Sequence, residues 1–331
     1  LILSSDLAAD FADMFHVRGF ASGARGNLLP AIVAGNRVSF GYQGADHVTR
    51  TTDVLLSIAP DQAETPAAEA PPPTEGPQGE GGTRLRQLPA PMRARLTWRI
   101  ALAPQASWDV DLSITPSTSE PDKSNDAAGE TLDVALARVR ESYEHWDSAA
   151  TIVTTDHEPF NQFLRRSSHD LRALTASLDD INMPIAGIPW FAVPFGRDSL
   201  IASYQALGFQ PELAKGTLRY LAARQGTADN PRRDEHPGKI LHEMRFGELA
   251  NTNSVPFNPY YGSIDSTLLF LMLFAETMNW TGDMEIYRQL LPAVLRALEW
   301  IDHYADLDGD GYIEFQRRAE IGLRIQGWKD S

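Results

Sequence analysis

The sequence predicts a β part followed by an α part: an N-terminal antiparallel β-sandwich over residues 1–126 and the first half of an α/α toroid over residues 127–331. Two observations lead to this fold class. Before residue 126, short runs rich in Val, Ile, Thr and aromatic residues alternate in the manner of half-buried strands. From about residue 130, apolar residues recur at spacings of three and four, which is typical of helices.

Five runs predict the strands of the sandwich, because each is short and β-branched or aromatic. They span residues 15–18, 37–42, 48–58, 94–102 and 108–114. Between two of them, residues 60–82 are almost wholly Pro, Ala, Glu, Gly, Gln and Thr. Such a segment is too poor in apolar bulk to offset its ordering entropy. We therefore expect a disordered insertion within a hairpin.

About six helices are expected after the strands. They cover residues 131–146, 160–174, 197–207, 211–225, 264–278 and 284–304. Thr131 can cap the first, and Pro211 stands at the first turn of another that ends at Gly226. The run 264–278 is apolar nearly all round, which predicts burial on both sides, and Pro292 predicts a break in the last helix.

Long loops separate these helices and contain most of the functional-looking residues. This arrangement favours helical hairpins whose loops build a site at one end. A closed toroid would need roughly twice as many helices. The chain also has no initiating Met and stops directly after a Trp-Lys-Asp motif. We therefore expect it to be a piece of a longer protein.

Composition limits the classes of partner. With 331 residues and 43% hydrophobic content, the chain can bury a sizeable core. A net charge of -15 disfavours nucleic acid and anionic membranes, which need a basic surface. There is no Cys, no apolar run long enough to span a bilayer and no signal peptide at the start. We expect a cytoplasmic protein with a neutral substrate and neither a nucleic-acid nor a membrane partner.

An aromatic loop at 189–199 is the first candidate site. Trp190 and Phe191 stand in a Pro- and Gly-containing loop that ends in the pair Arg197-Asp198. Aromatic faces beside a guanidinium and a carboxylate suit a neutral ring with many hydroxyl groups, because C–H faces stack while hydroxyls need oriented partners. The alternative is that the carboxylate merely starts a helix and Arg197 makes a surface ion pair.

Two further loops offer polar side chains. His242, Glu243 and Arg245 fall within one turn, either as a solvated and mutually paired charge cluster or as substrate contacts. For His242, a substrate hydrogen bond is favoured over a catalytic role. Tyr261 and Asp265 open the buried helix at 264–278. The carboxylate can be a helix cap, or the two residues can form a sugar wall.

An acidic loop at 306–314 matches the first nine positions of a calcium-binding loop. The candidate ligands are Asp306, Asp308, Asp310, Tyr312 through its backbone carbonyl, and Glu314. Position 12, where such loops place a bidentate Glu, is Arg317. This departure argues against a regulatory switch and leaves a structural Ca²⁺ completed by a distant carboxylate, or no ion at all. Without an ion, the aspartates would repel each other.

The last motif pairs Trp328 with Asp330. An apolar indole disfavours the ionised form of a neighbouring carboxyl group, which is how a glycosidase keeps a general acid protonated. Lys329 opposes this effect unless its side chain points elsewhere. The alternative is an ordinary charged residue near a chain end.

These motifs together resemble the amylo-α-1,6-glucosidase or glycogen-debranching type of protein, among the inverting glycosidases that include glucoamylases and trehalases. The resemblance rests on residues 10–19, Trp190 with 196–198, 261–266 and 327–330. It implies that Arg197 and Asp198 bind the terminal glucose of an α-linked glucan, with Trp190 beside them. The acidic loop is similar to structural calcium loops in some relatives.

By the same resemblance, Asp330 is the general acid of an inverting hydrolysis, although in trehalase-like relatives the acid directly follows the Trp. The base is expected outside this chain, so that the chain alone is inactive and its chemistry needs no cofactor. The expected substrate-binding residues are Trp190, Phe191, Arg197, Asp198, His242, Glu243, Tyr261, Asp265 and Trp328. A trehalase, another α-glucosidase and an inactive carbohydrate-binding protein remain alternatives; a calcium sensor is the weakest.

Overall fold

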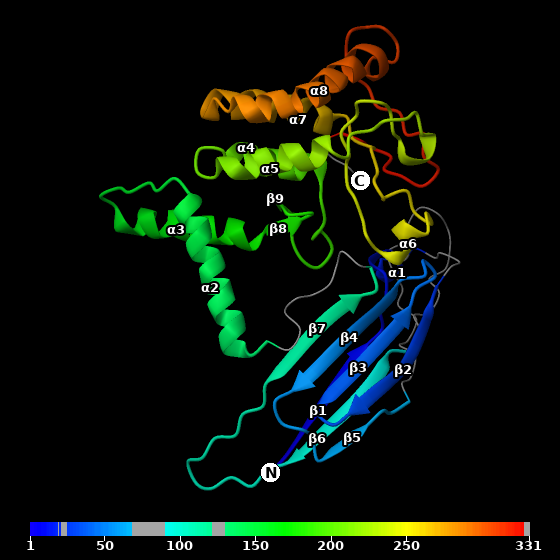
Figure 1. Ribbon diagram of the computed structural model, residues 1–331. Coiled ribbons are helices and arrows are strands. Elements are labelled where there is room, and N and C mark those ends of the chain that lie inside the picture. Colours follow the sequence, from blue (N-terminus) through cyan, green and yellow to red (C-terminus); the bar gives the residue numbers. More distant parts are fainter. Residues whose placement is uncertain (19, 21–24, 68–89, 121–129, 328–331) are drawn as a thin grey trace. The chain divides into compact units, whose positions relative to one another are not determined.

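The structure is a computed structural model that describes residues 1–18, 20, 25–67, 90–120 and 130–327 (Figure 1). The chain forms two compact units. The first comprises Leu1–Arg140 and Gly247–Ser254, and the second comprises Glu141–Phe246 and Val255–Ser331. This division differs from a single boundary at 126/127, because the first unit also takes in the start of a helix and a short segment from far along the chain.

The first unit contains two antiparallel sheets, as the alternating pattern predicts. Their strands are β1 Ile2–Ala9, β2 Asn27–Ala34, β3 Arg37–Gln43, β4 Thr49–Leu56, β5 Gln62–Glu64, β6 Met92–Arg99 and β7 Leu112–Thr118. The strand orders are β1-β6-β5 and β2-β3-β4-β7. One hydrophobic cluster takes Phe40 and Leu56 from one sheet and Leu96 and Trp98 from the other, so both sheets bury a face in the same core.

Two expectations for this unit are wrong. Residues 15–18 are not a strand: Met14–Val17 form the short helix α1, because the Asp13 carboxylate caps it by accepting from the Phe15 N–H at 2.9 Å. The segment 60–82 is not disordered at its start, where Gln62–Glu64 pair with β6 as β5. Backbone hydrogen bonds hold this strand without help from apolar side chains. Residues 68–82 lie outside the described part of the chain.

Helices follow the strands, which confirms the predicted β-then-α order. They are α2 Leu132–Ala149, α3 Glu158–Ala173, α4 Gly196–Ala206, α5 Pro211–Ala222, α6 Glu248–Asn251, α7 Asp265–Thr281 and α8 Met284–Trp300, which continues into a π turn at Ile301–Ala305. A hairpin of β8 Thr175–Leu178 and β9 Ile181–Pro184 follows α3. In the second unit α4, α5, α7 and α8 lie side by side and share one hydrophobic core (Figure 1).

The last two helices differ from expectation in detail. Pro292 does not break α8, because it lies on the exposed side while Leu290, Ala293 and Ala297 bury the opposite face. Helix α7 is not buried on both sides, since Met272, within the apolar run, is 53% exposed. Within the described ranges, none of the helices is both long and apolar enough to cross a membrane.

Candidate functional site

Two of the predicted site loops are joined to a third by backbone hydrogen bonds in the second unit. The Gly196 N–H donates to the His242 carbonyl at 2.7 Å, and the Met244 N–H donates to the Pro194 carbonyl at 3.1 Å. The His242 N–H in turn donates to the Tyr260 carbonyl at 2.7 Å. The loop 242–245 therefore lies between the loop that starts α4 and the loop that leads to α7.

Arg197 is fixed at the start of α4. It is 7% exposed, and its Nη1 donates to Asp265 Oδ2 at 3.2 Å and to the Gly327 carbonyl at 3.1 Å. The other Asp265 oxygen accepts from the Ser263 hydroxyl. Arg197 therefore makes an ion pair, as the alternative interpretation expected, but in a largely buried position and not at the surface. Asp265 is the first residue of α7, so α4 and α7 together orient this guanidinium.

The residues around Arg197 differ in exposure. Asp198, in the first turn of α4, is exposed. Phe191 is 44% exposed and its ring lies 6.1 Å from that of buried Phe195. Trp190 is half-buried, and its carbonyl accepts a hydrogen bond from the Arg245 guanidinium. The aromatic loop thus exposes aromatic side chains to solvent, while the Arg245 guanidinium holds its backbone at Trp190.

The charged loop at 242–245 is paired but not solvated. Glu243 Oε2 accepts from Arg245 Nε at 2.7 Å and from Nη2 at 2.6 Å, and each side chain is 8% exposed. The same guanidinium lies 5.2 Å from the centre of the Phe195 ring. His242 is 3% exposed and meets the Phe195 and Tyr260 rings edge to face. This loop packs against the aromatic loop through the Phe195 ring and through backbone hydrogen bonds to Pro194 and Gly196.

Tyr261 is placed in the core of the second unit. It is 3% exposed, and its hydroxyl donates to the Arg224 carbonyl at 2.8 Å. Burial, together with the nearby Glu235 carboxylate, raises the pKa of Tyr261 to about 12. Its neutral phenol therefore holds the loop before α7 against the end of α5.

The structure adds one centre that the sequence reasoning missed, which we call the Asp234 cluster: Asp234, Tyr260, Gln326 and the N–H groups of Arg318 and Ala319. Asp234 is 1% exposed. Its Oδ1 accepts from Arg318 N at 2.6 Å and from Ala319 N at 2.9 Å, and its Oδ2 accepts from Tyr260 Oη at 2.7 Å and from Gln326 Nε2 at 2.9 Å. Four donors thus satisfy one buried carboxylate.

The surroundings of Asp234 shift several pKa values. Burial, followed by the Asp234 charge, raises the pKa of Tyr260, which keeps this phenol a donor. Burial lowers the pKa of Lys239 to about 8, and its Nζ donates to the Asp234 carbonyl at 3.2 Å. Burial and the positive charges of Arg318 and Lys239 lower the pKa of His236 to about 4. The one local signal for Asp234 is its left-handed backbone, φ 50°, which Asp tolerates better than most residues.

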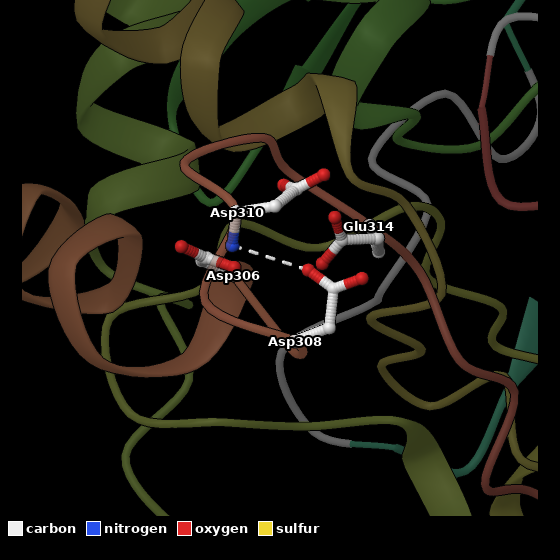
Figure 2. A group of neighbouring side chains, drawn as sticks. All are labelled: Asp306, Asp308, Asp310 and Glu314. Atoms are coloured by element: carbon white, nitrogen blue, oxygen red, sulfur yellow. Dashed lines mark hydrogen bonds between the residues drawn. The ribbon is translucent and has the colours of Figure 1, made fainter.

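The acidic loop at 306–314 gathers the four predicted carboxylates (Figure 2). One oxygen from each of Asp306, Asp308, Asp310 and Glu314 lies within 4.8 Å of the others. Backbone N–H groups of the loop orient them: Gly309 N donates to Asp306 at 2.7 Å, and Asp310 N donates to Asp308 at 3.2 Å, the dashed line of Figure 2. Tyr312, the fifth predicted ligand, is 74% exposed.

The two predicted residues of the last motif, Trp328 and Asp330, lie outside the described residues. The described chain ends one residue earlier, at Gly327, whose carbonyl accepts from Arg197. Arg197, Asp265 and Gly327 therefore come together from three separate parts of the sequence. Asp306, Asp308, Asp310 and Glu314 form a second group, built by one loop.

Comparison with known proteins bears on the first unit. Residues 1–113 match the family model described as the N-terminal domain of (some) glycogen debranching enzymes. No curated protein matches the chain. The match spans β1 to β6 and reaches the start of β7, and it supports the glycogen-debranching family that the sequence motifs resemble. The match ends before Trp190, so it includes neither the group around Arg197 nor the acidic loop.

Proposed function

We propose that this chain is part of a glycoside hydrolase that acts on α-linked glucans, of the amylo-α-1,6-glucosidase type. The main support is the orientation of Arg197, whose guanidinium is held by Asp265 and by the Gly327 carbonyl beside an aromatic loop. The match of residues 1–113 to a domain of glycogen debranching enzymes supports the same family.

The proposed subsite binds the terminal glucosyl ring. Arg197 donates to ring hydroxyls and the exposed Asp198 carboxylate accepts from them, while Trp190 and Phe191 offer faces for the C–H side of the sugar. Asp265 acts by holding the guanidinium in place. We assign His242, Glu243 and Tyr261 to the layer that supports these groups, because their side chains are at most 8% exposed and packed or paired within the protein.

The proposed reaction is an inverting hydrolysis. Asp330 protonates the glycosidic oxygen, a base carboxylate supplied from outside this sequence removes a proton from water, and the water attacks the anomeric carbon on the face opposite the leaving group. The bond from that carbon to the leaving oxygen breaks, which yields a free glucan hydroxyl and glucose of inverted configuration. Trp328 is proposed as the wall beside the acid. This chain alone is then inactive.

The fold proposals follow the same family. The shared core of the two sheets supports a β-sandwich, and the neighbouring helices α4, α5, α7 and α8 support part of an α/α toroid. We also propose a structural Ca²⁺ at the acidic loop, held by the four carboxylates and the Tyr312 carbonyl, because Ca²⁺ prefers clustered oxygen ligands. The ion takes no part in the chemistry.

Oligosaccharide binding tests the proposed subsite without requiring the base. We expect calorimetry to show that the chain binds panose and that Arg197→Lys weakens this binding by about tenfold or more, since a bidentate donor is replaced by a point charge. Arg165→Lys is the matched control, because Arg165 is a 62% exposed partner of Glu158. Equal affinities of the wild-type chain and Arg197→Lys would contradict the subsite.

Turnover separates the remaining alternatives. In a protein that also contains the proposed base, Asp330→Asn should reduce glucose release about 100-fold or more. Unchanged turnover would remove Asp330 as the acid. A preference for trehalose over panose, isomaltose and maltose would identify a trehalase-like enzyme, and binding without turnover would identify a carbohydrate-binding protein.

A further inference from the structure

Asp234 binds a segment that is distant in sequence. Three of its four donors belong to residues 318–327, at separations of 84, 85 and 92 positions. The fourth is the Tyr260 hydroxyl, which itself accepts from the Leu323 N–H at 2.9 Å. A methyl group added at Gly322 would lie 2.6 Å from the Tyr260 hydroxyl oxygen, so the segment passes closely around this phenol. The Asp234 cluster therefore fixes the path of residues 318–326.

The same segment ends at the groups that orient Arg197. The side chain of Gln326 is bonded to Asp234, and its backbone carbonyl accepts from the Ile264 N–H at 2.9 Å, directly before Asp265. The next carbonyl, that of Gly327, accepts from Arg197. Both acceptors of the Arg197 Nη1 are thus connected to Asp234 through residue 326.

We propose that Asp234 is a positioning residue for the glucosyl subsite: it fixes the Arg197 guanidinium through residues 318–327. This inference rests on the proposed function. Removing the Asp234 carboxylate leaves four buried donors without their acceptor, and they recover hydrogen bonds only if the segment moves. A displacement of about 1 Å is enough to disturb a bound ring.

A double-mutant cycle with Arg197 tests this role, with the affinity for panose as the measurement. We expect Asp234→Ala to weaken binding by about tenfold in the wild-type background and to have little further effect in the Arg197→Lys background, because it acts through that guanidinium. Equal losses in both backgrounds would overturn the inference, as would an unchanged affinity of Asp234→Ala. An Arg197→Lys variant that binds like the wild-type chain would instead contradict the proposed function itself.

Two further variants separate positioning from folding. Asp234→Asn keeps an acceptor for the Arg318 and Ala319 N–H groups, and its new NH₂ group can donate to the Gln326 amide oxygen once that amide turns over. Only the Tyr260 hydroxyl then loses its acceptor, so the affinity should stay within about threefold of wild type. Glu235→Gln is the matched control, because Glu235 is 2% exposed and its carboxylate accepts from the Thr227 and Ala228 N–H groups and pairs with Arg233. It should lower stability without changing affinity; if it weakens binding as much as Asp234→Ala does, the inference fails.

The connection can also be measured without a sugar. Amide hydrogen exchange at Ile264 reports its bond to the Gln326 carbonyl. We expect faster exchange there in Asp234→Ala than in Glu235→Gln. If Asp234→Ala does not fold, Gln326→Met takes its place in the cycle and in the exchange measurement, since it removes one donor and leaves the Asp234 bonds to residues 318 and 319. Unchanged protection of Ile264 in the folded variant would overturn the inference.

Discussion

The Asp234 cluster and the acidic loop are two carboxylate centres of the second unit that differ in burial and in how far along the chain their hydrogen-bond partners lie. Asp234 is 1% exposed, and its partners lie between 26 and 92 positions away. The acidic loop has its carboxylates at or near the surface, bonded to N–H groups two to seven positions away. The comparison teaches that a buried carboxylate with distant donors organises the chain around it, whereas a local, solvated group of carboxylates leaves oxygens for a cation.

The largest difference between the two centres should appear in stability. Asp234→Ala is expected to lower the free energy of unfolding by about 3–5 kcal/mol, because it strands buried donors. Asp308→Ala should change it by about 0.5 kcal/mol or less in metal-free buffer, since Asp308 is exposed. Urea unfolding followed by far-ultraviolet circular dichroism, which reports the helices, measures both. Equal losses would show that burial does not distinguish the two centres.

The same contrast explains what sequence could predict. The acidic loop was found from its spacing, because its geometry comes from one short stretch, and the four carboxylates do converge. The pairing of Arg197 with Asp265 was not foreseen, although both residues were candidates, because it depends on how α4 packs against α7. The sequence itself contains no signal for Asp234, whose left-handed backbone is seen only in the structure: an Asp in a charged loop is ordinary until a segment more than 80 positions away folds over it.

The errors in the predicted secondary structure also have local causes. The run at 15–18 has aromatic and β-branched residues typical of a strand, yet the Asp13 cap makes it a helix. Strand β2, Asn27–Ala34, was not predicted, because Pro30 interrupts its sequence and prolines are rare inside strands. The structure accommodates this proline where the pairing register with β3 shifts between Leu29 and Ile32. Strong helical periodicity, in contrast, correctly predicted the long helices of the described residues.

A calcium titration sharpens the comparison at the acidic loop. We expect Ca²⁺ at about 100 times its dissociation constant to add about 2.7 kcal/mol to the free energy of unfolding, and a chelator to remove this gain. Asp308→Asn should lose most of the gain, because it removes one carboxylate ligand and leaves the other bonds of the loop. Asp302→Asn, an exposed change outside the loop, is the control. A melting temperature that changes with neither Ca²⁺ nor chelator would contradict the calcium site.

The smallest effect is a pH dependence in the surroundings of Asp234. The pKa of His236 is lowered to about 4 by burial and by Arg318 and Lys239, against an opposing effect of Asp229 and Asp234. The unfolded state therefore binds more protons than the folded state between pH 4 and the ordinary value of 6.5, so stability is lost as the pH falls through this window. Since the ring is only half-buried, we expect at most about 2 kcal/mol in total.

Substitution of this histidine isolates its contribution. His236→Gln should flatten the dependence of the melting temperature on pH between 4 and 6.5, whereas His145→Gln, at an exposed position of α2, should leave the slope unchanged. Burial also lowers the pKa of His16 in the first unit, which adds a slope of the same sign. The difference between the wild-type and His236→Gln slopes is therefore the measurement. If the slopes are equal, the charge of His236 is as well solvated in the folded chain as in the unfolded one, and burial does not lower the pKa of this ring.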